Sequence, residues 1–184
     1  MADNQVLCFW ERVCMRRANR LTLTGEVAHR HEADELLRGP GTAVLVNRGV
    51  QRSLVIACPD GCGDTLTINL DERAGSAWRF YNDRRGASLF PSVWRDNGCR
   101  SHFIVWRSRI YWCDWEDDVL EGNDMALEDR VHKMLGPKFI SYARIADHLG
   151  EVPWAVLVAC NRLVSLGKAV EGKGTDRSKF KRPS

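Results

Sequence analysis

The spacing of hydrophobic and polar positions divides the chain into a strand-rich part followed by a helix-rich part. Short runs of alternating or β-branched residues, separated by turn residues, recur up to about residue 115 and are typical of strands. The predicted strands are residues 21–24, 42–47, 52–58, 65–70, 78–80, 102–106 and 110–115. We expect residues 20–115 to form one antiparallel, β-rich domain of about five to seven strands.

One helical segment interrupts this strand-rich part. Residues 31–37 have a helical spacing that Gly39-Pro40-Gly41 ends. His29, His31 and Glu32 stand at its start and could supply metal ligands or a general base. An acidic side chain in the first helical turn also suits the helix dipole, so we interpret them as the opening of a helix.

After residue 125 the hydrophobic period becomes helical. Leu127, Val131 and Leu135 share one helix face, and Ser141 is a candidate N-cap for a second helix over residues 142–149. Pro153 suits the first position of a third helix, which runs to about Leu166. The glycine-containing tail after residue 167 could form a β-hairpin. Three helices followed by a hairpin is the order of a winged helix-turn-helix.

These patterns predict an α+β protein with four segments. They are an N-terminal extension (residues 1–20), a zinc-binding β-rich domain (21–115), an acidic linker (116–125) and a winged-helix-like domain with a basic tail (126–184). The linker is assigned from its carboxylates and from Gly122-Asn123-Asp124.

Composition narrows the class of protein. The chain has 184 residues, is 44% hydrophobic and 28% charged, and carries a net charge of +3, which is an ordinary balance for a soluble globular protein. The longest apolar run, residues 154–160, is too short to span a membrane, and the N-terminus lacks the pattern of a secretory signal. We therefore expect a cytoplasmic protein without a membrane partner.

Seven cysteines in such a chain favour metal binding, catalysis or burial over disulfides. Cys58 and Cys62 flank a glycine-containing turn, and Cys99 and His102 form a second pair. Two such pairs supply the Cys3His set of a closed, zinc-ribbon-like structural site. The sequence therefore predicts a Zn²⁺ site formed by Cys58, Cys62, Cys99 and His102.

Three alternatives to this ligand set stay open. Cys113 could replace His102 as the fourth ligand. The four residues could be buried without binding a metal. A catalytic zinc could use the three cysteines alone, with Asp60 or Asp64 as general base.

The motifs around these residues resemble an uncharacterised bacterial family, a domain of unknown function. The resemblance rests on Cys58-Pro59-Asp60-Gly61-Cys62-Gly63, then Phe90-Pro91-Ser92, then Cys99-Arg100-Ser101-His102-Phe103, and then Arg109-Ile110-Tyr111-Trp112. It covers about residues 40–113 and implies a small zinc-binding β-domain with the same four ligands. Family members often carry a further cysteine where this chain has Asp60. Some accompany bacterial ubiquitin-like conjugation or defence genes.

The C-terminal segment suggests partners of two kinds. Six basic residues could neutralise nucleic-acid phosphates without reading sequence: Lys168, Lys173, Arg177, Lys179, Lys181 and Arg182. The third helix is almost wholly apolar over residues 152–160, which predicts a buried face rather than base contacts. This face could meet a protein partner, a second copy in a homodimer or the zinc-binding domain.

No Walker loop, dinucleotide fingerprint or G-x-S-x-G elbow is present. The leading hypothesis is a non-enzymatic, zinc-binding regulatory protein that contacts nucleic acid through its basic wing and tail. The alternatives are a protein-interaction adaptor in a bacterial ubiquitin-like or defence system and a zinc-dependent hydrolase.

Overall fold

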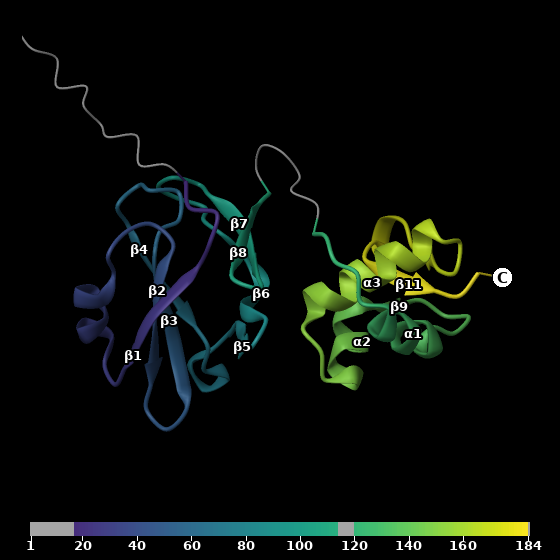
Figure 1. Ribbon diagram of the computed structural model, residues 1–184, viewed down its shortest axis with the longest axis horizontal. Coiled ribbons are helices and arrows are strands. Elements are labelled where there is room, and N and C mark those ends of the chain that lie inside the picture. Colours follow the sequence, from purple (N-terminus) through teal and green to yellow (C-terminus); the bar gives the residue numbers. More distant parts are fainter. Residues whose placement is uncertain (1–16, 114–119, 184) are drawn as a thin grey trace, which may run out of the picture. The chain divides into compact units, whose positions relative to one another are not determined.

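The computed structural model describes residues 17–113 and 120–183, so the expected N-terminal extension and acidic linker lie partly outside the described residues. The described chain is a mixed α+β structure whose sheets are mainly antiparallel (Figure 1). Contacts divide it into two compact units. The first holds residues 17–80 and 84–110, and the second holds residues 120–183 with the short pieces 81–83 and 111–113.

The first sheet is built from the predicted strands 42–47 and 52–58 and their neighbours. Its strand order is β1-β2-β3-β4, with β1 (Thr22–Val27), β2 (Thr42–Asn47), β3 (Gln51–Ala57) and β4 (Thr65–Asn69). Gly49 has a positive φ of 76° in the turn between β2 and β3, a conformation that glycine adopts without strain. The pairs β2–β3 and β3–β4 are antiparallel, as expected, but β1 pairs with β2 in parallel. The 3₁₀ helix η1 (Arg30–Leu36) forms the connection that a parallel pair requires.

The second sheet contains β6, a long strand that the sequence patterns did not predict. Its order is β5-β6-β7-β8, with β5 (Arg79–Asp83), β6 (Gly86–Trp94), β7 (His102–Trp106) and β8 (Arg109–Trp112). Between the pairs Leu89–Val105 and Val93–Phe103, β6 contains more residues than β7, so β6 bulges. Pro91 lies in this bulge and follows a cis peptide bond. A proline has no N–H for the sheet ladder, which suits it to a bulge.

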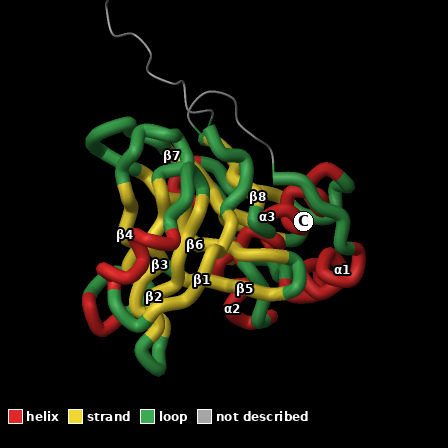
Figure 2. Tube along the Cα trace, turned by 60° about the vertical axis from the view of Figure 1, so that its left-hand side comes forward, coloured by secondary structure: helices red, strands yellow, loops and turns green. Residues whose placement is uncertain are grey.

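The core of the first unit lies on both faces of β2 and β3. On one face Val44, Val46 and Val55 pack with Ala33 of η1. On the other face Leu45, Leu54 and Ile56 are also buried. Figure 1 shows the second sheet on the side of β2 and β3 that faces away from η1, and Figure 2 shows the two sets of strands as neighbouring layers. Burial on both faces explains why β2 and β3 are continuous hydrophobic runs.

The second unit contains three α-helices and a small sheet. They are α1 (Met125–Met134), α2 (Tyr142–Leu149) and α3 (Pro153–Ser165), with the sheet order β10-β11-β9 formed by β9 (Ile140–Ser141), β10 (Val170–Glu171) and β11 (Lys179–Lys181). The predicted helix ends are confirmed: Ser141 Oγ accepts a hydrogen bond from Arg144 N, Gly150 is left-handed after α2, and Pro153 begins α3.

Two further 3₁₀ turns complete the described secondary structure, η2 (Glu72–Ala74) and η3 (Gly174–Asp176). The search for a membrane-spanning helix in the described parts of the chain found none of sufficient length and hydropathy.

Candidate active site and metal centre

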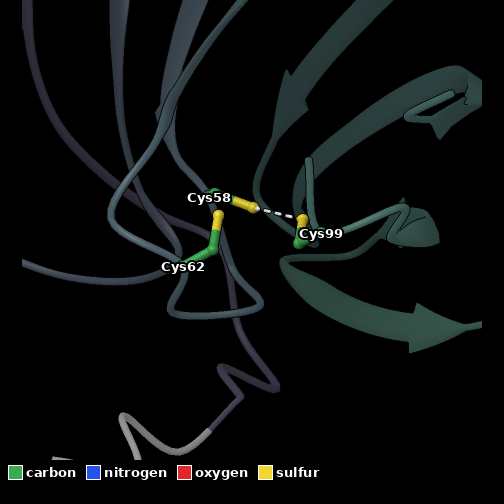
Figure 3. A group of neighbouring side chains, drawn as sticks. All are labelled: Cys58, Cys62 and Cys99. Carbon is green, nitrogen blue, oxygen red and sulfur yellow. Dashed lines mark hydrogen bonds between the residues drawn. The ribbon is translucent and has the colours of Figure 1, made fainter. Parts of the chain in front are cut away.

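Three of the four predicted ligands lie together at one end of the first unit. The sulfurs of Cys58, Cys62 and Cys99 all lie within 4.8 Å of one another, and those of Cys58 and Cys99 are 3.6 Å apart. Figure 3 shows Cys58 and Cys62 on the loop after β3 and Cys99 on the loop between β6 and β7. The two loops come from different sheets, so this thiol cluster joins them.

Local backbone geometry positions the first two cysteines. The Cys58 N–H donates to the Asp64 carbonyl at 2.8 Å, which closes the loop, and the Gly61 N–H donates to the Cys58 carbonyl. Gly61 and Gly63 have φ values of 81° and 86°, which favour glycine at both positions. This tight turn directs two side chains of one short segment toward the same point.

Arg95 contacts all three sulfurs. Its Nη1 lies 3.0 Å from the sulfur of Cys99, 3.4 Å from that of Cys62 and 3.7 Å from that of Cys58. Its Nη2 donates to the carboxylate of Asp64 at 2.9 Å. The arginine therefore supplies positive charge and N–H donors to a cluster that becomes negative when its thiols ionise.

The thiols differ in how readily they ionise. Burial raises the pKa of the Cys58 thiol to about 12. Burial also acts against ionisation of Cys99, but hydrogen bonding from Ser101 and from the two other thiols outweighs it and lowers the pKa of Cys99 to about 7. The Cys99 thiolate is thus available near neutral pH, and thiolate is the form that binds metals.

The arrangement fits a metal ion with a preference for sulfur. Tetrahedral zinc with bonds of about 2.3 Å to sulfur requires sulfurs about 3.8 Å apart. The distance of 3.6 Å between the Cys58 and Cys99 sulfurs is close to this value. Three cysteines within reach of one point could therefore hold a metal ion.

His102 is not part of this cluster. Its Nε2 lies 3.1 Å from Ser92 Oγ, and its ring lies 5.9 Å from the ring of Trp94 at an interplanar angle of 32°. The sequence-based assignment of His102 as the fourth ligand does not match this placement. Cys113 is not in the cluster either: its sulfur lies 3.9 Å from the Tyr111 carbonyl oxygen.

Ser92 and His102 together form an arrangement that the sequence analysis missed. A serine hydroxyl at 3.1 Å from an unprotonated imidazole nitrogen can donate its proton to that nitrogen, which activates the oxygen as a nucleophile. The signals available in the sequence were the positions of Ser92 and His102 within two of the motifs that carried the resemblance. The ten-residue spacing alone does not reveal the contact.

The bulge in β6 positions Ser92. Bulges redirect side chains and occur beside active sites. Ser92 lies between the last regular pair, Leu89–Val105, and the next one, Val93–Phe103. On the neighbouring side, the Trp78 indole N–H donates to the Ser92 carbonyl at 3.3 Å. The backbone of Ser92 is therefore also fixed by Trp78, a residue that precedes the β6–β7 hairpin.

Asp60 and Asp64, the two carboxylates considered as general bases for a catalytic zinc, are each paired with an arginine. Asp60 accepts from Arg17 Nε at 2.6 Å, and Asp64 accepts from Arg95. A pocket of about 480 Å³ borders the cluster, with Arg38, Cys58 and Asp64 among its lining residues. Ser92 and His102 do not line this pocket.

The predicted nucleic-acid-binding residues lie in the second unit and fall into two groups. Lys179 pairs with Asp176 at 2.9 Å, Lys181 lies over the ring of Phe139, and the Arg182 side chain donates to the His132 carbonyl. The remaining three residues, Lys168, Lys173 and Arg177, are exposed. A nucleic-acid partner stays a prediction.

The apolar third helix, α3, lies in the core of its unit. Its buried residues include Trp154, Val156 and Cys160, and it contacts both α1 and α2. Its Arg162 pairs with the buried Glu128 at 2.9 Å. The expectation that α3 meets a protein partner or a second copy also stays a prediction.

Comparison with known proteins gives one match. Residues 28–113, a little under half of the chain, match a family described as "bacterial ubiquitination-like system serine protease (BubE)". No curated protein and no solved structure matches. The match supports the resemblance to a bacterial family and the link to a ubiquitin-like system, and its description names a protease where the sequence analysis considered an adaptor. The segment that contains the thiol cluster, Ser92 and His102 is similar to this family.

Proposed function

We propose that the first unit is a serine protease of a bacterial ubiquitin-like system, with Ser92 as nucleophile and His102 as general base. The observation that carries this proposal is the distance of 3.1 Å between Ser92 Oγ and His102 Nε2. The family description of the matching segment supports the same chemistry.

The chemistry follows from the pair. Ser92 Oγ attacks the carbonyl carbon of the scissile amide while its proton passes to His102 Nε2. The protonated imidazole then gives this proton to the leaving amine nitrogen, which breaks the C–N bond and leaves an acyl-serine ester. Water, deprotonated by the same imidazole, hydrolyses the ester and restores the serine hydroxyl.

Removal of either side chain tests this mechanism. We expect Ser92→Ala and His102→Ala each to lower kcat for a fluorogenic peptide amide by about a thousandfold or more, because the nucleophile and its base act as a unit. Ser53→Ala is a matched control, since Ser53 is a half-buried strand serine of the same unit. Circular dichroism checks that each variant is folded. Undiminished turnover by folded Ser92→Ala would show that another group performs the reaction.

For the thiol cluster we propose a structural zinc ion held by Cys58, Cys62 and Cys99. Three thiolates carry more negative charge than Zn²⁺ balances, and the contact of Arg95 with all three sulfurs compensates the excess. When bound, zinc would cross-link the β3–β4 loop to the β6–β7 loop and contribute folding free energy. It takes no part in the proposed hydrolysis.

Metal analysis tests the zinc proposal. Wild-type protein purified without chelators should contain about one zinc per chain. Cys62→Ser should lose most of this zinc, because it removes one of the three proposed thiolate ligands. Cys62 is the exposed member of the cluster, so its replacement perturbs packing least. Cys160→Ser, which removes a cysteine of the second unit, should retain the metal. Equal zinc contents in Cys62→Ser and the wild type would refute the site.

The second unit has the element order of a winged helix. Helix α1 is followed by the short strand β9, then by α2 and α3, and then by the β10–β11 hairpin that pairs with β9. This supports the winged helix-turn-helix assignment. Because the first part of α3 is buried, base-specific reading of DNA by this helix is not part of the proposal.

A further inference from the structure

Trp94 is an exposed tryptophan beside the Ser92–His102 pair. The residue is 75% exposed, whereas Trp106 and Trp154 are 2% and 5% exposed. Leaving a large aromatic ring in water forgoes the free energy that its burial would contribute to folding. Such a ring at a candidate active site points to a role in contact with another molecule.

The position of Trp94 on the sheet is well defined. Ser92 Oγ lies 3.1 Å from His102 Nε2, so the Ser92 side chain is on the His102 face of the hairpin, while the buried Val93 points to the other face. Trp94 pairs directly with His102 of β7. Nucleophile, base and exposed indole therefore lie on the same face of the second sheet.

We infer that Trp94 forms an apolar subsite for a side chain of an extended polypeptide substrate whose scissile carbonyl lies at Ser92. The inference rests on the proposed protease function and adds a determinant of its specificity. An extended peptide advances about 3.3 Å per residue, so a side chain within about two residues of the scissile bond reaches the neighbourhood of Trp94.

The surroundings favour a chain laid across a surface over a small molecule in a cavity. Asp96, Asn97 and Gly98 continue the exposed surface beyond Trp94. β6 is an internal strand, bonded to β5 on one side and β7 on the other. A substrate therefore cannot add to β6 as a further strand. Beside Ser92 it must be recognised by side chains such as the Trp94 indole.

A second role for Trp94 predicts a different kinetic result. If the indole served only to orient the His102 ring, its removal would slow every substrate equally. A subsite affects only substrates that place an apolar side chain on it, and it leaves intact the reaction of a small ester whose acyl group has no side chain.

The experiment compares wild type, Trp94→Ala, Trp94→Phe and Val50→Ala. Val50 is an exposed apolar residue in the β2–β3 turn and serves as the control. The substrates are p-nitrophenyl acetate and fluorogenic tetrapeptide amides with leucine or serine at each of the four positions before the scissile bond. Steady-state assays give kcat and KM for each combination.

We expect one position at which wild type prefers leucine over serine by about tenfold in kcat/KM, mainly through KM. Trp94→Ala should reduce this preference to about twofold or less, and Trp94→Phe should restore most of it. The rate with p-nitrophenyl acetate should stay the same in all four proteins. A leucine preference that persists in Trp94→Ala, or an equal loss of rate with the small ester, would overturn the subsite.

The outcome separates the subsite from the protease proposal. If Ser92→Ala is inactive while Trp94→Ala behaves as wild type, the subsite is wrong and the nucleophile stands. If wild type cleaves no peptide and p-nitrophenyl acetate reacts equally fast with Ser92→Ala, both proposals are wrong.

Discussion

At the scale of single residues, two neighbouring positions at the start of β7 contact different groups. Ser101 and His102 are neighbours, yet Ser101 Oγ lies 3.3 Å from the Cys99 sulfur while His102 contacts Ser92. Ser101 ends the β6–β7 loop and His102 begins β7, so one short segment presents one residue to the thiol cluster and the next to Ser92. The motif spacing suggested a Cys-x2-His ligand pair because it does not show where the loop ends and the strand begins.

Another residue whose surroundings determine its ionisation is Asp71. It accepts hydrogen bonds from Arg73, at 2.8 Å to Nε and 2.9 Å to Nη2, and it also pairs with Arg52 of β3. The hydrogen bonds from Arg73, followed by that from Arg52, outweigh burial and hold the pKa of Asp71 well below its ordinary value of 3.8. Asp71 thereby links β3 to η2.

This lowered pKa predicts a pH-dependent contribution to stability. A carboxyl with a lower pKa in the folded state stabilises the fold fully above its ordinary pKa, and this contribution is lost as pH falls toward the folded-state value. The difference in unfolding free energy between wild type and Asp71→Asn should therefore be constant from pH 7 to about 5 and shrink below about pH 4. Urea unfolding at several pH values measures it, with the exposed Asp96→Asn as control. A difference that does not change with pH would contradict the account.

At the scale of elements, the ends of helices and strands could be predicted where the interactions that determine them lie within one short segment. The N-cap Ser141, the left-handed Gly150 and the N-terminal Pro153 fix the ends of α2 and the start of α3 through interactions inside a few residues. β2, β3, β4 and β7 were predicted close to their observed bounds because their β-branched residues repeat over short, well-bounded runs.

The strand β6 was missed for a physical reason. It begins after Arg84-Arg85 and contains Pro91, features that argue against a central strand. The bulge accommodates the proline, and only pairing with β5 and β7 makes the segment a strand. Because Ser92 lies in this bulge, missing the strand also meant missing the contact between Ser92 and His102. The parallel pairing of β1 with β2 likewise depends on long-range packing.

At the scale of the whole molecule, the β6–β7 hairpin contributes to both the thiol cluster and the proposed active site. The β6–β7 loop carries Cys99 toward the loop after β3, while the strands on either side carry Ser92 and His102. The cysteines were predicted from sequence because cysteines in turns have little packing role. Neither Ser92 nor His102 belongs to the thiol cluster.

The most direct test of the central claim is to locate the reactive serine. Wild-type protein treated with a fluorophosphonate should gain one covalent adduct, and mass spectrometry of its peptides should place that adduct on Ser92. The adduct should be strongly reduced in folded His102→Ala, because the imidazole activates the serine oxygen. An adduct on a different serine, or no reaction of the folded wild-type protein, would contradict the assignment of Ser92 and His102 as the catalytic pair.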